Sequence, residues 1–182
     1  MRRLNWCCFV SQTGKEVYDI CNLYGIAPKL LVTNNPRKLK QEVLEFLKEQ
    51  GCTFKVIPFR PELDYYLQED ILNSDIVTLH GYLRILPEEF ISRYDFRIYN
   101  GHPGLITAYP ELKGKDPQVR AWEGKYENVG SVVHEVTKEV DEGQILYVAT
   151  RKNTATTLDD MYNLLRDTSL EAWGKFFKDR VG

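Results

Sequence analysis

Apolar runs and amphipathic segments alternate along the first hundred residues of the sequence. The runs are short, rich in β-branched and aromatic residues and bounded by turn formers, which is typical of strands buried in a sheet; they cover residues 4–10, 29–33, 53–57, 75–80 and 96–99. The segments between them have the apolar spacing or the starting residues of helices, at residues 15–24, from Pro36 to Gly51, 61–69 and 87–91. This order predicts an α/β fold with an open, mostly parallel, Rossmann-like twisted sheet that carries helices on both faces.

The pattern changes after a loop over residues 105–117. Residues 129–137 alternate between apolar and polar positions, residues 140–143 have a turn composition, and residues 144–151 again have the pattern of a strand. We therefore expect an antiparallel C-terminal hairpin. A long helix capped by Thr157 should follow, with a buried stripe of Leu158, Met161, Leu164, Leu165, Trp173, Phe176 and Phe177. No linker or repeat interrupts the chain, so residues 1–182 are predicted to form one domain.

Composition narrows the class of protein. The 182 residues are 43% hydrophobic and 27% charged, which is typical of a globular chain. The net charge of −2 argues against a large nucleic-acid footprint, and no apolar run is long enough to span a bilayer or to serve as a secretory leader. The cysteines lack C-x-x-C spacing and lie far from the histidines, so we expect no metal site and predict core thiols in a reducing cytoplasm; they are Cys7, Cys8, Cys21 and Cys52.

Candidate chemistry first appears at residues 100–104. This stretch follows the predicted strand 96–99, and strand-like backbone would point Asn100 and His102 in the same direction. An imidazole exchanges a proton near neutral pH, and an amide donates a hydrogen bond to a developing oxyanion. Taken alone, the same residues fit a surface turn with an exposed histidine equally well.

Two downstream residues extend this candidate site. Ligands bind outside the carboxyl ends of the strands in such sheets, where His134 and Asp141 can join Asn100 and His102. This set suits acyl transfer to a nitrogen nucleophile: Asn100 would stabilise the oxyanion, and Asp141 would hold a protonated His102 or take the amine proton through a water.

Each of these residues also has a purely structural interpretation. Asp141 lies in a common turn composition, His134 between two valines fits a buried, hydrogen-bonded histidine, and His80 fits a strand-terminal residue. Composition and spacing alone therefore leave the function undecided.

Four motifs resemble, in order and spacing, the formyltransferase family that uses 10-formyltetrahydrofolate. They lie at residues 79–86, 99–105, 132–136 and 140–146, within a region of resemblance from about residue 75 to residue 150. The resemblance implies that Asn100, His102 and Asp141 form the catalytic triad and that His134 supports it. Among the members of the family, the sequence is most like the one of purine biosynthesis.

The resemblance also implies ligand contacts. Segments enclosing the folate would be Leu83, Arg84, Ile85 and Leu86, and Lys138, Glu139 and Val140. The acceptor would contact a first loop of Ser11, Gln12, Thr13, Gly14 and Lys15. It would also contact Lys113 and Gly114, in a second segment that leads to Arg120. Two departures stand out: the first of these acceptor loops has one glycine where the purine member is glycine-rich, and Gly104-Leu105-Ile106-Thr107 replaces the usual Ser-Leu-Leu-Pro.

These observations lead to one expected function and its alternatives. We expect formyl transfer from 10-formyltetrahydrofolate to the primary amine of a small, phosphorylated acceptor, with glycinamide ribonucleotide as first candidate and an amino-sugar nucleotide as second. The alternatives are a non-catalytic folate- or nucleotide-binding protein on the same fold, and a formyltetrahydrofolate hydrolase. The extra domains typical of the initiator-tRNA formyltransferase and of the hydrolase are not expected. We expect a cytoplasmic monomer or homodimer with no nucleic-acid or membrane partner.

Overall fold

A computed structural model describes residues 1–58, 62–94 and 97–181. They fall into two compact units, Met1–Asn100 and Gly101–Gly182. The prediction of a single domain over residues 1–182 stays a prediction. Within the described residues, no helix is both long and apolar enough to cross a membrane.

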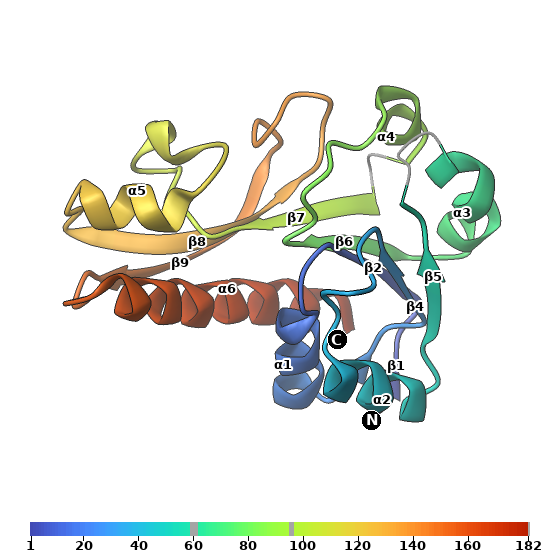
Figure 1. The fold of residues 1–182 in the computed structure, drawn as a ribbon. Helices are drawn as coiled ribbons and strands as arrows, with labels where there is room; N and C mark the ends of the chain where they lie inside the picture. The colour runs from blue at the N-terminus through green and yellow to red at the C-terminus, as the bar shows by residue number, and fades with distance from the viewer. Residues whose placement is uncertain (59–61, 95–96, 182) are drawn as a thin grey trace. The chain divides into compact units, whose positions relative to one another are not determined.

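Parallel strands form the centre of the first unit. Their order is β5-β4-β2-β6-β7 (Figure 1), and every neighbouring pair is parallel. The chain moves from β2 outward in one direction and then outward from β6 in the other, so the carboxyl ends of β2 and β6 flank the point where the strand order reverses. The strands are β2 (Trp6–Val10), β4 (Leu30–Thr33), β5 (Thr53–Val56), β6 (Ile76–His80) and β7 (Ile98–His102). The last two residues of β7 belong to the second unit.

Helices cover both sides of these strands. The pairs α1 with α2 and α3 with α4 are each in contact, and Figure 1 shows the two pairs on opposite sides of the strands. Their apolar faces and the buried strands make the core, which contains all four cysteines as free thiols, as predicted. The helices are α1 (Lys15–Tyr24), α2 (Gln41–Glu49), α3 (Leu63–Leu72) and α4 (Glu88–Tyr94).

Several predicted boundaries in the first unit were wrong. The helix expected from Pro36 begins only at α2, because Lys40 is extended and its N–H donates to the Thr13 carbonyl at 3.1 Å. The strand expected to end at residue 99 continues to His102 as β7. A small sheet of β1 (Arg2–Arg3) with β3 (Ile26–Ala27) was not predicted, since two residues carry no periodicity. Pro61 and Phe96 lie outside the described residues.

The second unit is built on an antiparallel hairpin. Strands β8 (Asn128–Glu135) and β9 (Ile145–Lys152) pair with a register shift between Val133 and His134, and α6 (Leu158–Val181) contacts both strands. The loop predicted over residues 105–117 contains a 3-10 turn, η3 (Pro110–Leu112), and the short helix α5 (Pro117–Glu123) was not predicted. The core here comprises Ile106, Leu112, Ala121, Val129, Val132, Met161 and Leu165.

The observed elements confirm the predicted α/β class. Parallel strands with helices on both sides are followed by an antiparallel C-terminal hairpin, in the predicted order.

Candidate active site

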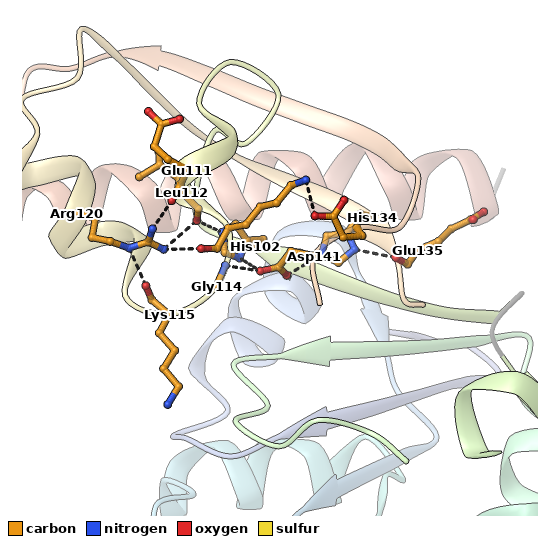
Figure 2. Close-up of polar contacts among 11 residues, drawn as sticks. His102, Glu111, Leu112, Gly114, Lys115, Arg120, His134, Glu135 and Asp141 are labelled. Carbon is orange, nitrogen blue, oxygen red and sulfur yellow. Dashed lines mark hydrogen bonds and ion pairs between the residues drawn. The ribbon is translucent and has the colours of Figure 1, made fainter. Parts of the chain in front are cut away.

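His102 ends β7 and is 5% exposed. Its Nε2 lies 2.8 Å from the Leu112 carbonyl oxygen, which can only accept, so Nε2–H is the donor (Figure 2). Its Nδ1 lies 3.5 Å from Oδ2 of Asp141. Gly104 leaves room for this ring position, because a Cβ atom at residue 104 would lie 2.9 Å from Nε2.

Asp141 lies in the turn between β8 and β9 and is 9% exposed. Its Oδ2 accepts a hydrogen bond from the Gly114 N–H at 2.8 Å. Its backbone is left-handed, with φ of 55°, a conformation that aspartate adopts more readily than most residues. The turn approaches β8 closely, since a Cβ atom at Gly143 would lie 1.7 Å from the Glu135 carbonyl oxygen. The turn composition and the functional interpretation of Asp141 are therefore compatible.

His134 lies on β8 at the register shift and is buried. Its Nδ1 lies 2.8 Å from the Glu135 carbonyl oxygen, so Nδ1–H donates to that oxygen. Its Nε2 lies 3.3 Å from Oδ1 of Asp141. The buried, hydrogen-bonded interpretation of His134 is confirmed, and the same bonds direct the other ring nitrogen at Asp141.

These contacts determine where protons can reside. His102 and His134 each donate one N–H to a carbonyl, so in the neutral rings a lone pair faces the Asp141 carboxylate on both sides. A ring nitrogen and the carboxylate, both acceptors, form a hydrogen bond only when one of them carries a proton. The three side chains can therefore hold and pass on a proton away from bulk water.

Burial and charge act in opposite directions on this cluster. Burial lowers the pKa of His102 below its ordinary value, although Asp141 and the Leu112 carbonyl favour the protonated ring. Burial alone would raise the pKa of Asp141, but the hydrogen bond from His134, the charge of His102 and the Gly114 amide outweigh it and lower that pKa. Asp141 is thus a carboxylate at neutral pH.

The loop that supplies Leu112 and Gly114 is organised by Arg120 of α5. The guanidinium group donates to four carbonyl oxygens of residues 111–115, as Figure 2 shows. The Nζ of Lys113, predicted to contact the acceptor, lies 2.9 Å from Glu142 Oε1 in the turn that carries Asp141. The sequence alone assigned no chemical role to Arg120, because its partners are main-chain oxygens and leave no motif.

The predicted acceptor loop of the first unit follows β2. Ser11 is buried, and its hydroxyl accepts the Leu83 N–H at 2.8 Å, which joins this loop to the predicted folate segment. Gln12 is exposed and Thr13 partly buried. Gly14 has a φ of 75°, and Lys15 Nζ lies 3.0 Å from Asp19 Oδ1.

The predicted folate segments are largely exposed. Leu83 and Ile85 are 69% and 58% exposed, Arg84 is also exposed, and Leu86 is buried. Lys138, Glu139 and Val140 lie in the exposed part of the loop before Asp141.

His80 ends β6 in a buried chain of hydrogen bonds. Trp6 Nε1–H donates to Thr78 Oγ1 at 2.6 Å, Thr78 Oγ1 lies 2.7 Å from His80 Nε2, and His80 Nδ1 lies 2.7 Å from Glu16 Oε1. The structural interpretation of His80 is therefore confirmed. Glu16, which the sequence did not single out, fixes the first turn of α1 to the carboxyl end of β6.

The structure thus brings His102, His134 and Asp141 together in the second unit. Asn100 is partly buried on β7, paired in register with Leu79 of β6, and belongs to the first unit. The alternation of side chains along a strand directs Asn100 and His102 to the same side of β7. The functional roles of these residues stay predictions.

Fold and site together define a class of protein: an α/β chain with a buried histidine–aspartate cluster suited to proton transfer during acyl transfer. A family model described as Formyl transferase matches residues 27–173. The chain belongs to this formyl transferase family.

Individual relatives differ in activity. Formyltetrahydrofolate deformylase 2, mitochondrial, of Arabidopsis thaliana is 26% identical over 137 residues, which cover 74% of this chain and 38% of the relative. Phosphoribosylglycinamide formyltransferase of Escherichia coli (strain K12) is 39% identical over 80 residues, which cover 44% of this chain and 36% of the relative. The matched part therefore spans less than half the length of these two relatives.

A solved structure shows the same fold. The phosphoribosylglycinamide formyltransferase from Streptococcus pneumoniae TIGR4 matches with a TM-score of 0.80 at 23% identity, over 100% of both chains.

Proposed function

We propose that this protein is a folate-dependent N-formyltransferase, which moves a formyl group from 10-formyltetrahydrofolate to the primary amine of a small acceptor. The observation that carries this proposal is the buried cluster of His102, His134 and Asp141 in a member of the formyl transferase family. Neither histidine needs to act as a covalent nucleophile, because the amine attacks the formyl carbon directly.

The cluster supplies the proton transfers that this reaction needs. Attack by the amine converts the formyl carbonyl into a tetrahedral oxyanion, which Asn100 would stabilise by a hydrogen bond. His102 donates its Nε2–H to the Leu112 carbonyl, so it would stabilise the oxyanion through the positive charge of its protonated ring. The amine nitrogen then loses one proton, and N10 of the folate gains one as its bond to the formyl carbon breaks. Asp141, with His134 behind it, would accept the first proton, directly or through a water, and return it to the leaving nitrogen. No net proton is gained or lost.

We further propose a phosphorylated acceptor, with glycinamide ribonucleotide as first candidate and an amino-sugar nucleotide as second. The similarity to the phosphoribosylglycinamide formyltransferase of Escherichia coli supports the first candidate. Residues 11–15 lead into the start of α1, where main-chain N–H groups favour an anion. Lys15 is paired with Asp19 and would have to exchange that partner for a phosphate.

Hydrolysis is the second candidate function, because the Arabidopsis thaliana relative is a deformylase. Water would then replace the amine at the formyl carbon and formate would leave. The same cluster would serve both reactions, so the difference lies in what occupies the acceptor position.

The test is a turnover assay with 10-formyltetrahydrofolate and a panel of amines, including glycinamide ribonucleotide. We expect folate release that depends on one acceptor and disappears in His102→Ala and Asp141→Asn. Asp167→Asn, an exposed aspartate on α6, is the matched control and should retain activity. Release without any amine would identify a hydrolase, and folate binding without turnover would identify a binding protein.

The cellular setting forms part of this proposal. All four cysteines are free and buried, which suits a reducing compartment such as the cytoplasm. A monomer or homodimer with small-molecule partners is sufficient for the proposed reaction.

A further inference from the structure

Arg120 projects from α5 into the curve of the loop over residues 111–115. Its Nε donates to the Lys115 carbonyl at 2.9 Å, and its Nη2 donates to the carbonyls of Leu112 at 3.1 Å and Lys113 at 2.8 Å. Its Nη1 donates to the Glu111 carbonyl (Figure 2). One guanidinium group thus collects four carbonyl oxygens from five consecutive residues.

Such a loop needs a cation at its centre. Carbonyl oxygens that converge on one point repel each other through their partial negative charges. A planar group with five N–H donors relieves that repulsion and fixes the direction of each carbonyl. A lysine at the same place would present three donors from a single point and would satisfy fewer of the four oxygens.

The same loop provides two contacts to the candidate active site. The Leu112 carbonyl, which Arg120 binds, also accepts the Nε2–H of His102 at 2.8 Å. Two residues later, the Gly114 N–H donates to Oδ2 of Asp141 at 2.8 Å. The shape of the loop therefore controls the separation of 3.5 Å between His102 Nδ1 and Asp141 Oδ2.

We propose that Arg120 is a positioning residue of the active site. Its guanidinium holds the loop over residues 111–115 in the curve from which the Leu112 carbonyl orients His102 and the Gly114 amide orients Asp141. Arg120 acts through the loop and takes no part in bond making. The catalytic consequence of this proposal rests on the proposed formyl transfer, whereas the structural consequence does not.

The first test compares Arg120→Ala and Arg120→Lys with Arg166→Ala, which removes an exposed arginine from α6. We expect kcat for formyl transfer to fall by about 100-fold in Arg120→Ala, because misplaced catalytic groups cost about that much. KM for the folate should change little, Arg120→Lys should recover part of kcat, and Arg166→Ala should match the unaltered protein. Added guanidinium chloride at millimolar concentration should partly restore Arg120→Ala, and equal sodium chloride should not.

The second test is independent of activity. Hydrogen exchange at the Gly114 amide, followed by NMR, should become faster in Arg120→Ala and slow again when guanidinium is added. Exchange within β8 and β9 should stay as in the unaltered protein. If the protein transfers no formyl group at all, the proposed function fails, and this measurement still decides the role of Arg120.

Two results would overturn the proposal. The first is that Arg120→Ala has the same rate of hydrogen exchange at the Gly114 amide and the same kcat as Arg166→Ala. The other is faster exchange throughout the second unit with no rescue by guanidinium, which would make Arg120 a general stabilising residue. If Arg120→Ala does not fold, Arg120→Lys decides: it keeps the charge and loses the planar fork, so behaviour identical to the unaltered protein contradicts the proposal.

Discussion

Single residues in the active site balance burial against charge. Asp141 is buried, yet its pKa is lowered, because a hydrogen bond from His134, the charge of His102 and the Gly114 amide favour its carboxylate form against burial. His102 is buried beside that carboxylate, and burial is the stronger influence on its pKa. Each group therefore depends on its neighbour for its protonation state, and this leads to two predictions.

The first prediction concerns Asp141→Asn. The Asp141 charge raises the pKa of His102 against the effect of burial, so its removal should lower that pKa further. The measurement is an NMR titration of the His102 ring, with Asp167→Asn as the control. An unchanged or higher pKa in Asp141→Asn would contradict this reading of the pair.

The second prediction concerns Gly104→Ser. The added Cβ would lie 2.9 Å from His102 Nε2 and 3.1 Å from the Cβ of Pro117, so the imidazole must move away from the Leu112 carbonyl. We expect kcat for formyl transfer to fall by about 10-fold with little loss of stability. A crystal structure, or the NMR resonance of the His102 Nε2–H, should show that the hydrogen bond to the Leu112 carbonyl is broken. An intact hydrogen bond together with full activity would contradict the prediction.

At the scale of elements, local sequence signals predicted the start of a helix correctly where no tertiary contact opposed it. The cap predicted at Thr157 is present, since its Oγ1 accepts the Asp160 N–H at 3.1 Å at the start of α6. The helix expected from Pro36 was wrong, because the tertiary hydrogen bond from Lys40 to the Thr13 carbonyl delays the helix start. Helix α5 has only seven residues, too few for its apolar spacing to stand out from the loop before it.

The third prediction tests this cap. Thr157→Ala should lower the free energy of unfolding by about 1 kcal/mol, because an N–H at the start of α6 loses its acceptor. Thr154→Ala, at an exposed position shortly before the helix, is the matched control and should have little effect. Urea unfolding of the two variants makes the comparison, and equal losses would show that the cap contributes nothing specific.

At the scale of the whole molecule, the buried site makes stability depend on pH. The folded-state pKa of His102 lies below its ordinary value of 6.5, so the unfolded chain binds more protons in the interval below that value. The stability that the neutral ring contributes is fully present above pH 6.5 and is lost as pH falls through the folded pKa. The pKa of Asp141 is also lowered, so the stability that its carboxylate contributes is lost in the same way as pH falls below 3.8.

The fourth prediction concerns this loss of stability at acidic pH. Urea unfolding should show a free energy of unfolding that falls as pH drops below 6.5. In His102→Gln that part of the decline should be weaker, because no imidazole gains a proton on unfolding at that position. A decline of equal slope in both proteins would assign it to other groups.

The fifth prediction uses the four thiols of the first unit. Burial raises the pKa of Cys21 to about 12 and that of Cys52 to about 12, and it raises the pKa of Cys7 and Cys8 as well. Thiolates are the reactive form, so labelling by a thiol reagent should be slow in the folded protein and rapid in urea. Rapid labelling without denaturant would show that the first unit opens readily.

The sequence by itself determined the type and order of most elements, the family, and the candidates Asn100, His102, His134 and Asp141. Periodicity and side-chain chemistry carry that information locally. Only the tertiary structure decided how the three members in the second unit are held. The Leu112 carbonyl holds His102, the Gly114 amide holds Asp141 and the Glu135 carbonyl holds His134, while the guanidinium of Arg120 holds the loop of Leu112 and Gly114. The physical reason is that every residue offers a main-chain donor or acceptor, so which of them is used depends on folding and leaves no mark in the order of side chains.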